Sequence, residues 1–225
     1  FISGAFVRDL VDGVRAAAAD AGWALEMSLY SNFQPATEDG PFDGCLLLRP
    51  EREAALGIKR LGIPAILLDI QHPRSGLSFV ETDNADGIRQ AVEHLTSLGH
   101  QRILYAHSDL EAEVNHSGRE RYRAFVEQTR ELRIPGADDT VRAESLETRI
   151  GGSDFTAVIT DGYSSTSEIH NQLSRLPAVP PRDLPVVAFD PMGLAEPMPA
   201  PLTVVRQNLL EAGRLGRHAP IAGSG

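Results

Sequence analysis

The chain has 225 residues, 42% of them hydrophobic, so it can bury a core as one large domain or two lobes of about 100 residues each, and disorder is excluded. Its formal net charge of −10 argues against nucleic-acid binding by this segment, because phosphate contacts need a clustered positive surface. No apolar run approaches the roughly 20 residues of a membrane-spanning helix, which argues against a membrane partner.

The first quarter of the chain predicts alternating helices and strands. Apolar residues at three- and four-residue steps predict a helix over 6–21 that ends at Gly22, and its scattered charges do not fit a signal peptide. The following elements are expected to be a strand at 24–30, a polar loop at 31–42, a strand at 44–48, a helix at 52–61 and a strand at 64–70. The only cysteine, Cys45, is expected to be a buried small hydrophobe, and a single cysteine fits a reducing, cytoplasmic compartment.

Residues 80–103 read VETDNADGIRQAVEHLTSLGHQRI, a loop, a helix, a stop and a strand in one phrase. Asp83 and Asn84 suit a helix start, where short polar side chains accept from unpaired backbone N–H groups. The apolar face of the predicted helix consists of Ile88, Ala91, Val92, Leu95 and Leu98. Gly99 occupies the position of a left-handed C-terminal cap, so a buried strand is expected from Ile103.

The second half of the chain continues the alternation. Its predicted elements are a helix at 117–130, a strand at 157–160, a helix through Ile169 and Leu173, strands at 185–189 and 202–205, and a helix at 208–218. Residues 131–151 give no clear pattern. Strands that alternate with helices predict an α/β fold with parallel sheets.

Several phrases in this order resemble the LacI/GalR family of transcription regulators, in their effector-binding domain. They are residues 6–14, DGCLLLRP at 43–50, GIPAILLD at 62–69, TDNADG at 82–87, AVEHLTSLGHQRI at 91–103, RERYRAF at 119–125, TAVITD at 156–161, DLPVVAFD at 183–190 and PLTVVRQN at 201–208. Each phrase alone is weak, but their joint order and spacing make a chance match improbable.

The resemblance implies a periplasmic-binding-protein-like fold of two Rossmann-like lobes with a ligand cleft between them. By analogy the first lobe covers residues 1–106 and is completed by 207–225, and the second covers 107–206. The chain is expected to cross near Ala106 and again near 189–191 and 205–207. In parallel sheets, ligands bind beyond the carboxyl ends of the strands.

The resemblance also implies a set of ligand-binding residues: Asp86, Arg121, Asp190, Phe189, Thr160, Gln207, Phe6 and Ser117. Some have a structural alternative. Asp86 may be read equally as a helix N-terminal acid, Phe189 as core, and Ser117 as a cap. Asp161 is expected to cap the next helix instead of contacting ligand.

Competing chemistry finds little support. The run HSDLEAEVNH at 107–116 holds two histidines and three acids, yet it reproduces no metal-site spacing. No phosphate-binding loop, dinucleotide fingerprint or nucleophile elbow is present in the sequence. We therefore expect no enzyme activity, no metal and no cofactor.

The functional expectation is the ligand-sensing, dimerising part of a LacI-type regulator controlled by a small effector of the sugar class. Pro191 replaces an acid usual in the family, which leaves the identity of the effector open. Operator DNA would be bound by a helix-turn-helix head that this sequence does not contain. The alternative is a periplasmic sugar-binding protein of an ABC transporter; upstream residues would separate the two, as a signal peptide or a helix-turn-helix pattern.

Overall fold

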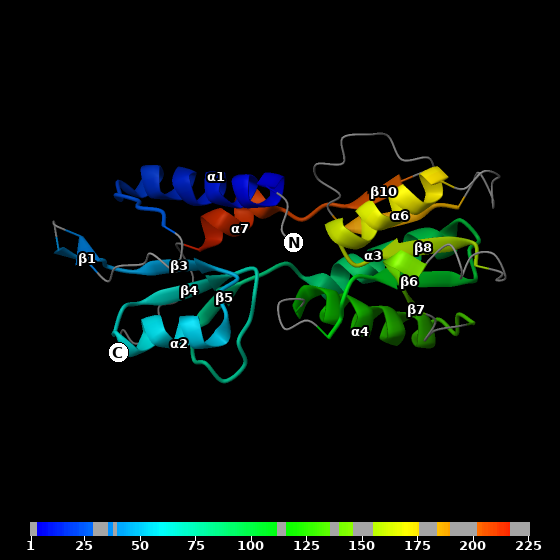
Figure 1. Ribbon diagram of the computed structural model, residues 1–225, viewed down its shortest axis with the longest axis horizontal. Coiled ribbons are helices and arrows are strands. Elements are labelled where there is room, and N and C mark those ends of the chain that lie inside the picture. Colours follow the sequence, from blue (N-terminus) through cyan, green and yellow to red (C-terminus); the bar gives the residue numbers. More distant parts are fainter. Residues whose placement is uncertain are drawn as a thin grey trace. The chain divides into compact units, whose positions relative to one another are not determined.

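The computed structural model describes residues 4–28, 36–37, 40–111, 116–135, 140–145, 155–175, 184–189 and 202–216. The chain forms two compact units. The first contains residues 83–207 together with 1–6, and the second contains residues 7–82 and 208–225. Each unit has its own parallel sheet with helices against it (Figure 1).

The first unit contains a five-stranded parallel sheet in the order β10-β9-β8-β6-β7. Its strands are β6 (Ile103–His107), β7 (Thr140–Arg142), β8 (Ala157–Thr160), β9 (Val186–Phe189) and β10 (Leu202–Val205). Its helices are α3 (Asn84–Ser97), α4 (His116–Glu131), α6 (Tyr163–Arg175) and the short 3₁₀ helix η2 (Ala143–Ser145). Helix α4 lies between β6 and β7 in the chain and α6 lies between β8 and β9, and both strand pairs are parallel, as helical crossovers require.

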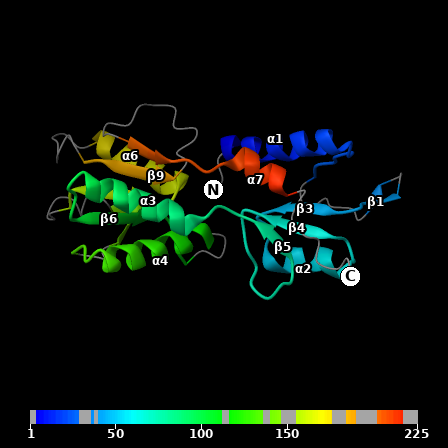
Figure 2. The same cartoon turned by 180° about the vertical axis from the view of Figure 1, so that it is seen from behind.

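Alternating side chains divide the core of the first unit into two layers. Tyr105 and Ile159 project to one face, against α3 and α4, which lie side by side in Figure 2. Leu104 and Val158 project to the other face, against Ile169 of α6. Because both faces are covered, the central strands β6, β8 and β9 are buried and mostly apolar, as expected for a parallel sheet between helices.

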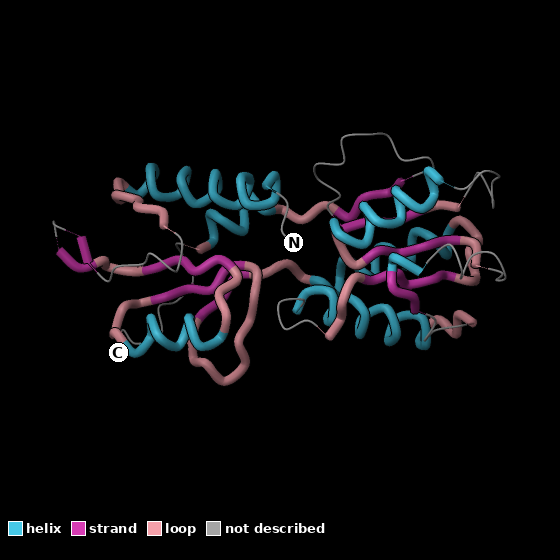
Figure 3. Tube along the Cα trace, in the orientation of Figure 1, coloured by secondary structure: helices cyan, strands magenta, loops and turns pink. Residues whose placement is uncertain are grey.

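The second unit contains a three-stranded parallel sheet in the order β3-β4-β5. The elements are α1 (Gly4–Ala21), β3 (Cys45–Leu48), α2 (Arg52–Arg60), β4 (Ala65–Leu68), β5 (Ser78–Val80), α7 (Leu209–Leu215) and the short antiparallel pair β1 (Ala36–Thr37) and β2 (Gly40–Pro41). Helices α1 and α7 cover one face of the sheet and α2 covers the other (Figure 3).

Helices α1 and α7 cross in very close contact through two glycines. A Cβ atom on Gly13 would lie 2.1 Å from the carbonyl oxygen of Leu210, and one on Gly213 would lie 2.2 Å from that of Leu10. Any side chain at either position would collide with backbone that has no room to move. The two helices can pack at this distance only because both residues are glycine.

The phrase 80–103 folds as predicted. The Asp83 side chain accepts a hydrogen bond from the backbone N–H of Asp86 at 2.9 Å, which caps α3. Gly99 follows the helix with a φ of +89°, and Gly22 ends α1 with a φ of +69°. The other predicted helices are also confirmed, within a few residues at each end, as are the predicted strands that correspond to β3, β4, β6, β8, β9 and β10. The strands β5 and β7 were not predicted.

Two local expectations differ from the structure. The predicted strand at 24–30 is wrong over its described part, residues 24–28, which have no strand structure and in which Met27 is exposed. Alternation alone cannot form a strand without a neighbour to pair with. Cys45, expected to be buried, is half-buried because β3 lies at one edge of the order β3-β4-β5, and burial raises the pKa of its thiol.

The division between the units also differs from the predicted boundary after Ala106. The structure divides the chain between Thr82 and Asp83. Helix α3 and strand β6, which were predicted to lie in the first lobe, therefore belong to the unit formed by residues 83–207, which corresponds to the predicted second lobe. The reason is pairing: β6 lies between β7 and β8, with Ile103 opposite Ala157, and the apolar face of α3 packs against α4. The end of that unit falls at Gln207, as expected for the last crossing.

Candidate functional site

The carboxyl ends of the strands of the five-stranded sheet carry a cluster of polar side chains. Asp161 directly follows β8, and Ser108 follows β6. Asn84, at the start of α3, and Arg121, in α4, reach the same edge of the sheet, because Arg121 bonds both Asn84 and the backbone of Asp161. This is the edge at which parallel α/β sheets bind ligands.

Arg121 is the centre of the cluster and is only 5% exposed. Its Nε–H donates to the Asn84 side-chain oxygen at 2.7 Å, and Nη1 donates to the carbonyl oxygen of Asp161 at 2.6 Å. Its guanidinium carbon lies 4.1 Å from the centre of the Phe189 ring. Two hydrogen bonds and an aromatic face fix the plane of the guanidinium, whose fork of donors has the geometry for planar recognition of a polar group.

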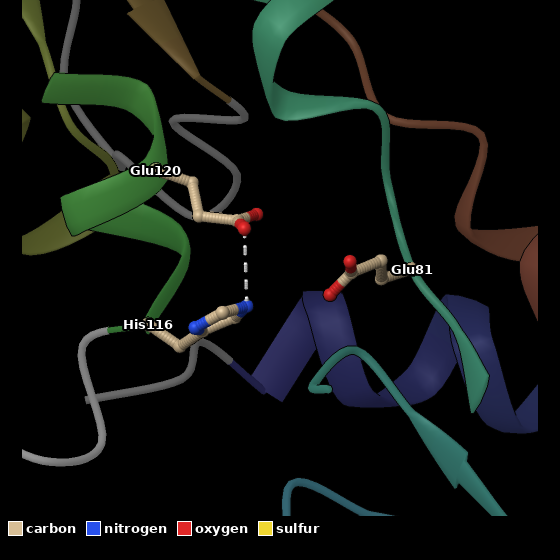
Figure 4. A group of neighbouring side chains, drawn as sticks. All are labelled: Glu81, His116 and Glu120. Carbon is tan, nitrogen blue, oxygen red and sulfur yellow. Dashed lines mark ion pairs between the residues drawn. The ribbon is translucent and has the colours of Figure 1, made fainter. Parts of the chain in front are cut away.

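Asn84 connects Arg121 to a second charged group. Its side-chain N–H donates to Glu120 Oε2 at 3.1 Å, and Asn84 is itself only 4% exposed. Glu120 in turn lies 3.4 Å from His116 Nε2, one turn earlier on α4 (Figure 4). Sequence reasoning assigned Asn84 to the helix start and gave Glu120 no role; a buried polar pair across two helices leaves no local signal.

Asp161 is nearly buried and joins the ends of two strands. Its carboxylate accepts from both the backbone N–H and the hydroxyl of Ser108, each at 3.1 Å, and its own N–H donates to the carbonyl of Ala106 at 3.1 Å. The first turn of α6 is bonded through the Gly162 carbonyl, which accepts from the Thr166 hydroxyl. These contacts of Asp161 tie the end of β6 to the end of β8, and its predicted role as a helix cap stays a prediction.

Phe189 ends β9 and is packed tightly. A Cβ atom on Gly87 would lie 2.7 Å from Phe189 Cε1 and 3.3 Å from Val205. The ring therefore contacts the α3 backbone at Gly87 and also stacks on Arg121. Its burial, at 1% exposed, agrees with the core interpretation, and its contact with ligand stays a prediction.

The remaining predicted site residues lie in different surroundings. Thr160 is fully buried, and its hydroxyl bonds that of Thr166 at 2.7 Å. Ser117, Gln207 and Phe6 are buried in α4, after β10 and in α1 respectively. Asp190 lies outside the described residues.

Asp86 lies in the first turn of α3 with its side chain 43% exposed. Its carboxylate accepts from Arg89 Nε at 3.1 Å and from Gln90 Nε2 at 2.6 Å, and these hydrogen bonds, Arg89 first, lower its pKa. The structure therefore brings Asn84, and not Asp86, to Arg121. The position of Asp86 in the first turn of α3 and its bonds to Arg89 and Gln90 agree with the helix N-terminal alternative.

Tyr105, in β6, packs against the helix that carries Arg121. Its hydroxyl donates to the carbonyl of Gly118 at 3.3 Å, and its ring packs against Tyr122 and Phe125. Burial, and then the negative charge of Asp161, raise the pKa of Tyr105 well above its usual range. Tyr105 is thus a neutral, rigid support on which the first turns of α4 rest.

The second unit has its own polar pair at the carboxyl end of its sheet. Arg49 follows β3 and Asp69 follows β4; both have positive φ, +43° and +59°, which non-glycine residues rarely adopt. Arg49 Nη1 donates to Asp69 Oδ2 at 2.9 Å, and Asp69 is nearly buried. His72 Nε2 lies 2.8 Å from the Pro50 carbonyl, which ties the two loops together. Sequence reasoning missed this pair, although an acid that ends the apolar run IPAILLD was visible.

The acidic and histidine run at 107–116 has internal partners where it is described. Asp109 lies 3.3 Å from Arg142 Nη2, and His116 pairs with Glu120. Glu113 lies outside the described residues. Among the helices that the structure describes, none is both long and apolar enough to cross a membrane.

Comparison with known families decides what kind of domain carries this cluster. The family model described as a periplasmic binding protein-like domain matches residues 92–216, more than half of the chain. The chain belongs to the periplasmic binding protein-like domain family. No curated protein sequence gives a significant match.

Solved structures share the fold of this periplasmic binding protein-like domain. A transcription regulator from Lactobacillus plantarum is 20% identical over 95% of this chain and 85% of its own, with a TM-score of 0.74. A LacI family regulator from Enterococcus faecium with bound ribose is 20% identical over 97% and 85%, at 0.73. A LacI family regulator from Weissella paramesenteroides with bound sucrose is 18% identical over 97% and 87%, at 0.77. The predicted α/β fold is thereby confirmed.

Proposed function

We propose that this domain is the effector-binding and dimerising part of a LacI-type transcription regulator that senses a small ligand of the sugar class. The observation that carries the proposal is Arg121, a buried cation held by hydrogen bonds at the carboxyl end of a parallel sheet. The solved structures of similar fold support it, since several are named as LacI family regulators and were solved with ribose, sucrose or glucose bound.

The geometry suits a polyhydroxylated ligand. A guanidinium offers a planar fork of donors for vicinal hydroxyls, and the Phe189 ring keeps that fork in one plane. In the second unit, the Arg49–Asp69 pair presents a donor group and an acceptor group at the equivalent edge of its sheet. We propose both edges as ligand-contacting surfaces, and Asp190, Thr160, Gln207, Phe6, Ser117 and Asp86 remain candidate contacts.

The proposed mechanism is a population shift. A ligand can favour one conformation of the domain over another only if it binds that conformation more tightly. In a cytoplasmic homodimer joined to helix-turn-helix heads, such a shift would change operator affinity by the same coupling free energy. The chain itself, with a net charge of −10, would leave DNA contact to those heads.

The second candidate function is the sugar-binding component of an ABC transporter, which is expected to have the same fold. The regulator is favoured because the phrase LGHQRI at 98–103 and the phrase PLTVVRQN at 201–208 resemble regulators. The similar solved structures named above are also titled as regulators.

Calorimetric titration of D-ribose, D-glucose and sucrose tests the proposal. Arg121→Ala should weaken binding of the preferred sugar by about 10- to 100-fold, the loss of a hydrogen bond to a charged group. Arg123→Ala is the matched control, since Arg123 is an exposed arginine on the same helix. Equal affinity in the Arg121→Ala and Arg123→Ala proteins would refute the assignment of the site.

A further inference from the structure

Asn84 lies between two charged side chains, one of which requires a hydrogen-bond acceptor and the other a donor. Arg121 Nε–H requires an acceptor, and the Asn84 oxygen supplies it at 2.7 Å. The Glu120 carboxylate can only accept, and the Asn84 N–H donates to it at 3.1 Å. An amide carries one acceptor side and one donor side, so the two neighbours together allow a single orientation of the Asn84 amide.

Burial makes that orientation consequential. Asn84 and Arg121 are 4% and 5% exposed, so water has little access to replace a lost partner of the guanidinium. The Glu120 side chain is 32% exposed and is the end of the relay nearest to solvent. The chain of contacts therefore runs inward, from Glu120 through Asn84 to Arg121.

We infer that Asn84 is a positioning residue for the ligand arginine, and that Glu120 acts on Arg121 through the orientation of the Asn84 amide. The inference rests on the proposed role of Arg121 in ligand binding and adds the residues that hold it ready. Preorganisation of this kind raises affinity because the arginine does not have to be ordered when ligand arrives.

The effect of Glu120→Ala should depend on whether residue 84 is asparagine or aspartate. In Asn84→Asp, both carboxylate oxygens accept, so Arg121 keeps its partner without any need for Glu120 to orient the group. Glu120→Ala should therefore weaken sugar binding by about 3- to 10-fold in the natural background, less than the loss of a direct hydrogen bond to a charged group, because Glu120 acts only through Asn84. The same substitution should leave binding unchanged, or improve it, in the Asn84→Asp background, where it also removes a like charge.

The hydrogen exchange rate of the Arg121 Nε–H reports how firmly Asn84 holds the arginine, and it can be measured without any ligand. In the full chain labelled with ¹⁵N-arginine, the Arg121 Nε–H resonance, identified by its loss in Arg121→Lys, should exchange slowly with water. Asn84→Leu, nearly isosteric but without an acceptor, should accelerate that exchange at least about 10-fold, and Asn84→Asp should preserve the protection. Calorimetry with ribose, glucose and sucrose is then run on the same proteins.

The outcomes are distinct. Unchanged Arg121 exchange in Asn84→Leu, or an equal effect of Glu120→Ala in both backgrounds, would overturn the inference. If Asn84→Leu fails to fold, the comparison of Glu120→Ala in the natural and Asn84→Asp backgrounds still decides it by exchange. If the exchange pattern follows expectation and no sugar of the panel binds, the proposed function fails while the positioning of Arg121 by Asn84 and Glu120 stands.

Discussion

Gly87→Ala is the sharpest test of how the site is packed. The added Cβ would lie 2.7 Å from Phe189 Cε1 and 3.0 Å from Phe189 Cζ, where an ordinary contact begins near about 3.4 Å. Phe189 is only 1% exposed, so its ring has no solvent to move into and must press on the guanidinium of Arg121. Overpacking of this kind costs about 1–3 kcal/mol, and the gain in helix propensity from glycine to alanine returns about 1 kcal/mol. We expect a net destabilisation of the first unit of about 0–2 kcal/mol and weaker sugar binding.

The matched control is the same substitution in a Phe189→Leu background, where the colliding ring atoms are absent. There the closest remaining contact of the new Cβ is Val205 at 3.3 Å, so Gly87→Ala should cost less than in the natural background and, if Val205 gives way, stabilise the protein by up to about 1 kcal/mol. Hydrogen exchange along β9 during denaturant titration reports the first unit separately, because the only tryptophan, Trp23, lies in the second. An identical change in unfolding free energy in both backgrounds would refute the collision as the cause.

Three further predictions concern stability. Gly213→Ala forces a Cβ to within 2.2 Å of the Leu10 carbonyl and should destabilise the second unit by about 2–4 kcal/mol by Trp23 fluorescence, whereas Gly4→Ala, with no atom within 4 Å, should not destabilise it. Asp86 has a pKa below its ordinary 3.8 when folded, so its stabilising contribution is present above that value and lost as pH falls through the folded pKa. The unfolding free energies of the natural protein and Asp86→Asn should therefore differ at neutral pH and converge in acid; a difference independent of pH would contradict this. Asp69→Asn should cost about 1–3 kcal/mol in urea unfolding by leaving its partly buried arginine partner with a weaker acceptor, and an unchanged midpoint would show that the pair is not stabilising.

The elements themselves could be predicted from the sequence because their signals are local. The helix at 84–97 has a capping acid, an apolar face at regular steps and a terminal glycine, all within one phrase. The buried strand at 65–68 is a continuous apolar run. Such signals depend only on neighbouring residues, and the structure agrees with them.

The boundary between the units could not be predicted in this way because strand pairing is not local. Nothing in residues 103–107 says that β6 pairs with β7 and β8 instead of with β5. The strand predicted at 24–30 failed for the same reason, since its alternation gives no partner. The family resemblance predicted the fold correctly. It placed the first passage of the chain between the units after Ala106, about 24 residues later than the observed position after Thr82.

Helix geometry explains why Asn84 bonds Arg121 and the predicted site residue Asp86 does not. Asn84 and Asp86 are two positions apart, so they project about 200° apart around the helix axis. Asn84 faces α4 and bonds Arg121 and Glu120, whereas Asp86 bonds Arg89 and Gln90 on its own helix. A sequence can place both at a helix start, but the phase of the helix against α4 is fixed only by packing.

The hydrogen bond to Asn84 links Arg121 to the start of α3, close to the boundary between the two units. Asn84 is the second residue after the point at which the chain passes from the second unit to the first. A ligand that draws the guanidinium of Arg121 toward itself must stretch or break the 2.7 Å bond to Asn84, or carry the start of α3 with it. Because Arg121 is also bonded to the segment after β8 and stacked on the end of β9, it cannot shift alone. Under the proposed function, a ligand-induced movement of the Arg121 side chain would therefore reach the start of α3, next to the point at which the chain passes between the two units.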